Sequence, residues 1–201
     1  MAEPGQPVHA GRLLSVQTGR AAPLQAGGRR ILSAIGKRPV TGPVTVQAMG
    51  LAGDEQADLS VHGGLDKAVY AYPHEHYGFW QAQRQAHGVS LFDEALPPGF
   101  VGENLSLLGL LEHQVFVGDT LHFADCVLRV TAPREPCFKF NAVMGFNTAA
   151  RLMATQARCG FYLAVAQPST LVAGEPFTVV AGRRALSIQQ AIMGKLAKHL
   201  R

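Results

Sequence analysis

Hydrophobic and polar positions alternate along much of the chain, in short runs separated by Gly, Asp or Pro. An alternation of period two is typical of half-buried β-strands, because successive side chains point to opposite faces of a sheet. Turn-like pairs such as Gly118-Asp119 and Ala124-Asp125 separate neighbouring runs. The pattern predicts strands over Gly11–Gln17, Val44–Ala48, Ala68–Tyr72, Gln114–Val117, Thr120–Phe123, Cys126–Thr131, Phe161–Ala166 and Pro176–Val180.

Three segments have helical spacing instead. The first runs from about His74 to His87 and follows Pro73, which suits a helix start. The second runs from about Asn147, a good N-cap, to Arg158, and the third spans Leu186–Leu200. The residues at helical spacing are Tyr77, Trp80 and Arg84; Ala150, Ala154 and Ala157; and Ile188, Ile192, Leu196 and Leu200.

Frequent strands with few helices predict a mainly β fold, a closed or nearly closed β-barrel with a few peripheral helices and a short C-terminal helix. We expect residues 1–182 to form the barrel domain. Residues 183–201 are predicted to form a basic amphipathic helix that packs on the body or on a partner subunit.

The composition is typical of a single folded domain and excludes a disordered chain or a membrane-spanning protein. The chain has 201 residues, 47% hydrophobic and 16% charged, which suits one folded domain and excludes a disordered chain. No apolar run approaches the ~20 residues that span a bilayer, and the first residues lack the apolar core of a signal peptide. We therefore expect a cytoplasmic protein that does not bind membranes.

The net charge of +4 comes from the end of the chain. Five of the 18 basic residues, and none of the 14 acidic residues, follow residue 182. The rest of the chain has thirteen basic and fourteen acidic residues, so it carries no basic stripe of the kind that binds nucleic acid. We expect no nucleic-acid partner.

The three cysteines differ in their surroundings. An odd number without a CxxC pair fits neither a disulfide framework nor a zinc finger. Cys126 and Cys159 adjoin predicted strands, where a small hydrophobic side chain is the expected role. Cys137 instead follows Ala-Pro-Arg-Glu-Pro, and Arg134 and Lys139 flank it. Nearby cations favour the thiolate, which binds metals and attacks electrophiles, so Cys137 is the candidate functional thiol.

The densest polar cluster spans Gly53–Lys67, between two predicted strands. Gly63 and Gly64 let the backbone approach a ligand and present N–H groups to an anion, and Lys67 adds a charge suited to phosphate. A solvated loop is the alternative. His62 is the histidine with a candidate site role, including a hydrolase pair with Cys137, although a structural or capping role is equally open.

Two other loops are candidate ligand-binding segments. Gly36–Pro39 is a small basic loop that suits either a surface turn or an anion site. Gly102–Asn104 is a polar break in which Asn104 either donates to a ligand or closes a turn. Neither a phosphate-binding P-loop nor a G-x-S-x-G elbow is present, and His74-Glu75-His76 lacks the spacing of a zinc protease.

In their order and spacing, these segments resemble the MOSC domain, in its YiiM-like subgroup. The resemblance runs from about residue 10 to 181 and covers nearly the whole predicted barrel. Its motifs are Ser33–Val40 with Gly42–Val44, Gly53–Asp58, His62–Gly64 with Asp66–Ala68, Tyr72-Pro73 with Glu75–Tyr77, Gly102–Asn104, Val117–Asp119, and Pro133-Arg134 with Pro136-Cys137 and Lys139.

The resemblance implies a β-barrel that binds the molybdenum cofactor (Mo-molybdopterin) and reduces N-hydroxylated compounds. It gives Cys137 the position of the metal ligand or of a carrier of reactive sulfur. Asp58 or His62 is the candidate proton donor, and a soft thiolate suits a metal that also binds dithiolene sulfurs. The candidate cofactor-binding residues are Lys37, Arg38, His62, Gly63, Gly64, Lys67, Asn104, Arg134, Lys139 and Asn141.

The chain departs from the subgroup at three points. Only one clear helix follows residue 184, where a longer helical segment is usual. Cys159 stands where Ser or Thr is expected, and Phe138 replaces the more usual Trp. With no iron–sulfur or flavin module, the chain needs electrons from an external electron-transfer reductase, and a homodimer is compatible with the sequence.

Three functions therefore remain open on the sequence. The first is a molybdenum oxidoreductase that acts on small N-hydroxylated compounds, with Cys137 as metal ligand. The second is a sulfur-carrier or cofactor-handling module, in which Cys137 holds a persulfide. The third is a non-redox binding domain, in which Cys137 is buried and the basic tail docks a partner.

Overall fold

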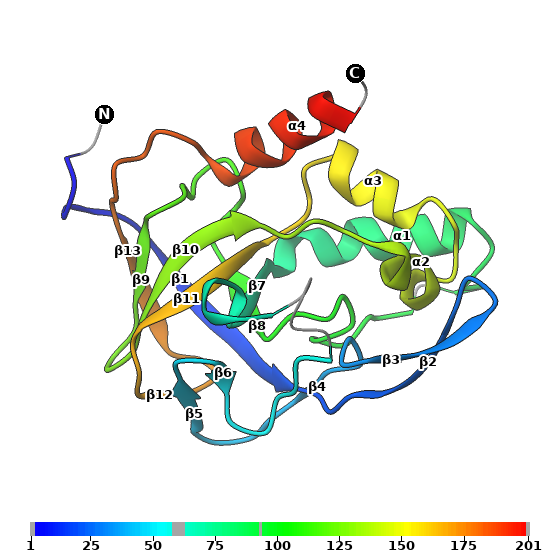
Figure 1. The fold of residues 1–201 in the computed structure, drawn as a ribbon, viewed down its shortest axis with the longest axis horizontal. Helices are drawn as coiled ribbons and strands as arrows, with labels where there is room; N and C mark the ends of the chain where they lie inside the picture. The colour runs from blue at the N-terminus through cyan, green and yellow to red at the C-terminus, as the bar shows by residue number, and fades with distance from the viewer. Residues whose placement is uncertain (1–2, 58–62, 93, 200–201) are drawn as a thin grey trace.

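A computed structural model describes residues 3–57, 63–92 and 94–199 and confirms the predicted barrel (Figure 1). Its strands follow the order β13-β9-β10-β11-β7-β8-β1, and pairing of β1 with β13 closes the sheet. Only β7 and β8 pair in parallel within this barrel. The strands are β1 (Pro7–Thr18), β7 (Val69–Pro73), β8 (Leu105–Leu108), β9 (Thr120–His122), β10 (Val127–Pro133), β11 (Phe161–Gln167) and β13 (Pro176–Val180).

Side chains fill the barrel interior. Leu128 and Val130 alternate with exposed Arg129 along β10, as the sequence pattern requires. Leu121 from β9 and Phe161 from β11 are also fully buried in the same cluster. Burying one such side chain stabilises the fold by about 1.5–3 kcal/mol. The barrel is therefore a packed core, and any ligand must bind outside it.

Short strands extend the barrel at one end. β4 (Arg38–Pro39) pairs with β1, and a small sheet joins β12 (Thr170–Leu171), β5 (Val44–Gln47) and β6 (Gly50–Leu51). The sequence pattern predicted neither β8 nor the hairpin of β2 (Ala22–Ala26) and β3 (Arg29–Ser33). Gly27 and Gly28 make the two-residue turn of that hairpin with φ of +57° and +73°, a conformation that glycine adopts readily.

The helices lie outside the barrel. Figure 1 shows α1, α2 and α3 gathered at one side and α4 along the top. Ile188 and Ile192 of α4 are buried, and α4 contacts β10 and α3, so this helix packs on the body. The helices are η1 (Leu65–Lys67), η2 (His74–His76), α1 (Tyr77–Ala86), α2 (Phe138–Met144), α3 (Ala149–Thr155) and α4 (Ile188–His199).

The structure corrects details of the predicted helices. The helix predicted from His74 starts with the 3₁₀ turn η2 and continues as α1. Asn147 is not the N-cap of α3: Thr148 holds that place, and the Asn147 carbonyl accepts a bond from Asn141 Nδ2 (2.7 Å). Ala150 is only half-buried, because the face of α3 that packs carries Ala149, Met153 and Ala154. Helix α4 begins at Ile188 rather than Leu186, and Leu200 lies outside the described residues.

The strand predicted over Gln114–Val117 does not form. Asp119 Oδ2 accepts the Phe116 N–H (3.0 Å), and the Asp119 N–H donates to the Phe116 carbonyl (3.0 Å). These bonds close a turn. The β-pairing of this segment is therefore limited to one isolated β-bridge, between Phe116 and Ser187. An Asp side chain that competes for backbone donors therefore overrides the alternating pattern.

None of the helices in the described part of the chain has the length and apolar character that crossing a bilayer requires.

A fully buried carboxyl group fixes the loop before β8. Glu103 Oε1 accepts bonds from the Tyr77 hydroxyl, the Gly99 N–H (2.8 Å) and the Ser106 hydroxyl (2.8 Å). Glu103 Oε2 and the nearby barrel acceptor Gln17 Oε1 are buried without a hydrogen-bond partner. Burial raises the pKa of Glu103. The loop is thus tied to both α1 and β8.

We expect Glu103→Gln to remove a pH dependence of stability. The pKa of Glu103 is higher in the folded than in the unfolded chain, so between the two values the folded state binds more protons. Stability of the natural chain should therefore fall as pH rises through that window, by at most about 1.4 kcal/mol per pH unit. Urea unfolding from pH 5 to 8 should show the variant gaining stability relative to the natural chain as pH rises.

The control is Glu94→Gln, which changes an exposed carboxylate of the same charge. It should leave the slope of stability against pH unchanged. Equal slopes in the natural chain and the Glu103→Gln variant would contradict the assignment.

Candidate functional site

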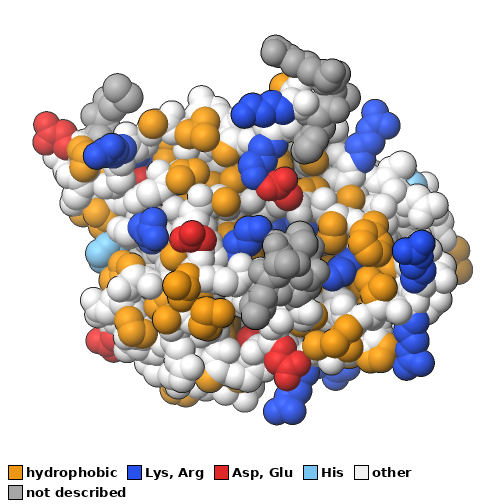
Figure 2. Space-filling view, viewed as in Figure 1, with side chains coloured by type: hydrophobic (Ala, Val, Ile, Leu, Met, Phe, Trp, Pro, Cys, Tyr) orange, Lys and Arg blue, Asp and Glu red, His pale blue; other side chains and the backbone are white. Residues whose placement is uncertain are grey.

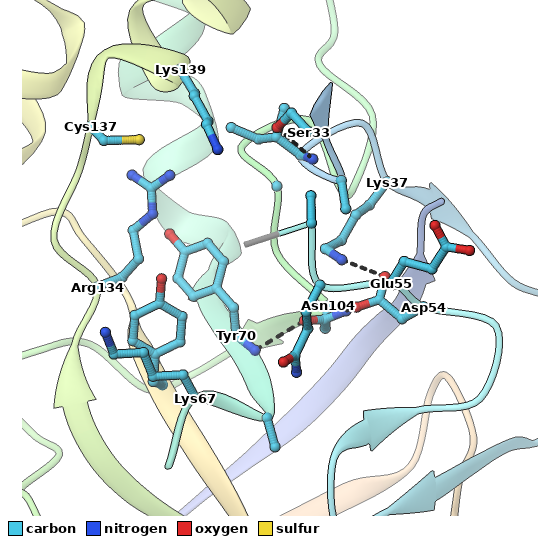
Figure 3. Close-up of a pocket in the computed structure, with 17 residues that line it drawn as sticks. Ser33, Lys37, Asp54, Glu55, Lys67, Tyr70, Asn104, Arg134, Cys137 and Lys139 are labelled. Carbon is cyan, nitrogen blue, oxygen red and sulfur yellow. Dashed lines mark hydrogen bonds and ion pairs between the residues drawn. The ribbon is translucent and has the colours of Figure 1, made fainter. Parts of the chain in front are cut away.

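A pocket of about 660 Å³, counted to its open mouth, lies beside the barrel (Figure 3). Figure 2 shows Lys and Arg side chains spread over one face of the molecule, with fewer Asp and Glu. The residues that line the pocket lie between positions 33 and 37, 54 and 57, 67 and 70, 102 and 104, and 134 and 139, with Tyr162 from β11.

One wall of the pocket carries the candidate thiol. Cys137 is the N-cap of α2 and is partly exposed, just after β10 ends. Pro133 and Pro136 restrict the backbone of the connecting loop. Figure 3 shows Arg134 and Lys139 near Cys137 on this wall. The sequence prediction that the three residues share one site is consistent with this arrangement.

Arg134 is a buried cation held by aromatic rings. Its side chain is 5% exposed, and its Cζ lies 5.5 Å from the Tyr70 ring centroid and 5.3 Å from that of Phe140. Among the ion pairs of the described residues, none includes Arg134. A guanidinium stays charged in proteins, and burying an unpaired charge is costly. The wall beside Cys137 therefore favours a bound anion.

The opposite wall carries a cation that is already paired. Lys37 forms an ion pair with Asp54, and both side chains are less than a tenth exposed. Asp54 also accepts the Gly19 N–H (2.8 Å) and the Asn104 side-chain amide (2.8 Å). Burial lowers the pKa of Lys37, and Asp54 opposes that shift without cancelling it. Figure 3 shows this pair across the pocket from Cys137.

Asn104 lines the pocket, but its amide is committed to the protein. Its Nδ2 donates to the Gln17 carbonyl (3.2 Å) and to Asp54 Oδ2 (2.8 Å), and its Oδ1 accepts the Tyr70 N–H (3.1 Å). Both amide protons are therefore used. Asn104 positions Asp54 and the ends of two strands, and only its second oxygen lone pair remains for a ligand.

The structure brings together six of the candidate residues and separates others. Arg38 is exposed on β4 and Asn141 bonds Asn147 and Ala150, so neither lines the pocket. Gly63 and Gly64 are outside the lining, and the Gly64 N–H donates to Gln56 Oε1 (2.9 Å). Asp58 and His62 lie outside the described residues. The six in the lining are Lys37, Lys67, Asn104, Arg134, Cys137 and Lys139.

Three lining residues with evident chemical roles were not among the candidates from the sequence. Tyr70 and Tyr162 supply ring faces to the lining. Both lie in predicted strands, where an aromatic side chain is expected to belong to the hydrophobic core. Asp54 was one acid in a polar cluster, and its pairing with Lys37 has no signature in the sequence. The rule that buried lysines need partners would have prompted a search for such an acid.

The other two cysteines are structural. Cys126 and Cys159 are fully buried, and burial raises the pKa of the Cys126 thiol to about 11 and that of Cys159 further still. Neither lines the pocket. In the described part of the chain, His, Cys, Asp and Glu side chains form no group of three suited to a metal. A metal at this pocket therefore needs ligands beyond Cys137.

Comparisons with known proteins agree with this architecture. A MOSC domain model matches residues 58–178. The chain is 37% identical over 159 residues to Protein YiiM of Escherichia coli (strain K12), covering 79% of this chain and 69% of that protein. The crystal structure of YiiM from Geobacillus stearothermophilus superposes with a TM-score of 0.70 at 28% identity, covering 94% of this chain and 91% of that one.

A further relative is called a reductase. This protein of Gibberella moniliformis (strain M3125 / FGSC 7600) is 34% identical over 171 residues, which are 85% of this chain but only 29% of that protein. MOSC domains as a family are associated with binding of the molybdenum cofactor. The family model covers more than half of the sequence, and the barrel matches that of YiiM. The chain therefore belongs to the MOSC domain family.

Proposed function

We propose that this protein binds the molybdenum cofactor in the pocket and reduces N-hydroxylated compounds. The observation that carries the proposal is the wall on which the candidate thiol Cys137 accompanies Arg134, a buried cation without an ion pair among the described residues. The family's association with this cofactor and the relative named as a reductase support it.

The donor set fits the cofactor. A thiolate is a soft ligand that suits a transition metal already bound by dithiolene sulfurs. The cofactor's phosphate is an anion, and Arg134, Lys139 and Lys67 in the pocket lining would neutralise it. The ring faces of Tyr70 and Tyr162 offer flat apolar contact for a pterin. When bound, the cofactor supplies the two-electron chemistry.

The residues of the chain then bind and orient the reactants. The loop between Pro133 and Pro136 holds Cys137 at the start of α2, where its thiolate would serve as a ligand to the metal of the cofactor. Reduction converts N–OH to N–H and releases water, and it consumes two electrons and two protons. We propose that an external electron-transfer reductase supplies the electrons.

We predict that Cys137→Ser loses both metal and activity. Serine keeps the size of the side chain but offers a hard oxygen in place of the soft sulfur. The protein should be made in a host that synthesises molybdopterin and purified without oxygen. Elemental analysis should find close to one molybdenum per natural chain and almost none in the variant, with hydroxylaminopurine reduction by a chemical reductant lost in parallel.

Cys126→Ala is the matched control, because it removes a buried thiol that does not line the pocket. It should keep metal and activity. Full activity of Cys137→Ser would refute the proposal. A natural chain without metal or pterin, carrying an added mass of about 32 Da on Cys137, would favour the sulfur-carrier function instead.

We also predict that Arg134→Gln weakens retention of the cofactor. Glutamine preserves part of the packing against Tyr70 and Phe140 but removes the charge. The loss of one charge-assisted contact should lower affinity roughly tenfold or more. Pterin fluorescence after dialysis measures retention, and near-ultraviolet circular dichroism checks the fold.

Arg129→Gln serves as the control for this variant. Arg129 lies on β10, the strand that precedes Arg134, and its half-exposed side chain is 3.8 Å from Asp66. Its loss should leave pterin content unchanged. Equal pterin content in the Arg134 variant and the natural chain would contradict the role of Arg134.

A further inference from the structure

The pocket cations Arg134 and Lys37 differ in whether a neighbouring carboxylate already neutralises their charge. Among the described residues, no Asp or Glu forms an ion pair with Arg134, so no carboxylate neutralises its charge. The charge of Lys37 is already balanced by Asp54. A lysine paired in this way attracts a phosphate much less than an unpaired cation does. Lys37 is thus a poor anchor for the cofactor, although the sequence suggested that role.

The surroundings of Lys37 suit a group that exchanges a proton with a ligand. Its side chain is 8% exposed and still lines the pocket, so the ammonium is poorly hydrated but reaches the ligand space. Burial disfavours the charged form and lowers the pKa of Lys37. Asp54 keeps the ammonium in place, and the bonds from Gly19 and Asn104 hold the Asp54 carboxylate in its orientation.

The charged groups that face Lys37 come from two neighbouring segments. Asp54 forms the ion pair, and the buried carboxyl of Glu103 also favours the charged form of Lys37 when it is ionised. Glu55, next to Asp54, accepts the Ala21 N–H (2.8 Å). Arg134 and Lys139 lie on the wall with Cys137 in Figure 3. An N–OH group bound between the walls would therefore have the cofactor on one side and Lys37 on the other.

We propose that Lys37, positioned by Asp54, is the acid that protonates the departing hydroxyl group. This role rests on the proposed function. The N–O bond breaks, and the two electrons from the external reductase stay with the nitrogen. Lys37 gives one proton to the oxygen, which leaves as water, and the nitrogen takes the second proton from solvent. Lys37 then recovers its proton from water.

The substitution that tests this role is Lys37→Arg. Arginine keeps the positive charge and the pair with Asp54, but a guanidinium does not release its proton in proteins. We expect the variant to keep its molybdenum and pterin and to lose about 100-fold or more in kcat, the usual range for a general acid. KM should change little. Lys198→Arg, on the exposed surface of α4, is the control and should be unaffected.

The pH profile gives a second signature. Activity of the natural protein should fall as pH rises through the pKa of Lys37, because the neutral amine has no proton to give. Asp54→Asn removes the charge that raises this pKa, so the fall in activity should move to lower pH. The fall should be absent from the residual activity of Lys37→Met.

A readout independent of the cofactor is the titration of Lys37 itself. In apoprotein labelled with ¹⁵N-lysine, the Nζ signal that disappears in Lys37→Arg should titrate below the ordinary value of 10.5. An ordinary or higher midpoint would overturn the proposal, as would full kcat in Lys37→Arg. Loss of pterin from Lys37→Arg would show that Lys37 holds the cofactor and would also overturn it. A natural protein that contains no cofactor defeats the proposed function, and this inference with it.

Discussion

The site depends on the hydrogen bonds of one asparagine. Asn104 bonds to Tyr70 on β7 and to Gln17 on β1 through both its backbone and its side chain. It therefore connects two strands at the place where the barrel changes from antiparallel to parallel pairing. The remaining amide proton orients Asp54, which holds Lys37. A substitution at Asn104 would leave buried strand groups unpaired and free the carboxylate at the same time.

The pocket separates charge between its two walls. On one wall, Arg134 is desolvated against aromatic rings, which preserves its attraction for an anion. On the other wall, Lys37 and Asp54 form an ion pair whose charges cancel, and the Lys37 ammonium carries the proton. The difference comes from the partners of the two cations rather than from their type. Under the proposed function, the anionic cofactor and the proton that is transferred to substrate would therefore use different cations.

The sequence was most informative where local pattern and tertiary structure agree. Alternation in Cys126–Thr131 identified β10, which has one face in the packed interior. The continuous apolar run Phe161–Ala166 identified β11, whose first four residues are all buried. Alternation was wrong for Gln114–Val117, where the Asp119 side chain closes a turn. The helix α2 was missed, because its seven residues are too few for a clear period and directly follow a proline-containing loop.

In the candidate site too, the sequence identified residues that are close together in the chain more readily than pairs that only the fold brings together. Cys137 and its flanking cations are close in sequence, so local chemistry sufficed to select them. Arg38 and Asn141 adjoin lining residues in sequence, yet neither lines the pocket. The partner of Lys37 lies 17 residues away in another loop, and only the folded chain brings the two together.

Closure of the barrel between its first and last strands sets the order in which the protein is completed during synthesis. Pro7 pairs with Val180, so β1 waits for almost the whole chain before it gains this neighbour. Contacts between distant residues slow folding, because a long loop must be closed before they form. On the ribosome, Lys37, Asp54 and Cys137 all emerge before β13, and the segment that supplies Gln17 lacks its final support until then. The walls of the pocket are therefore fully supported only once β13 has paired with β1.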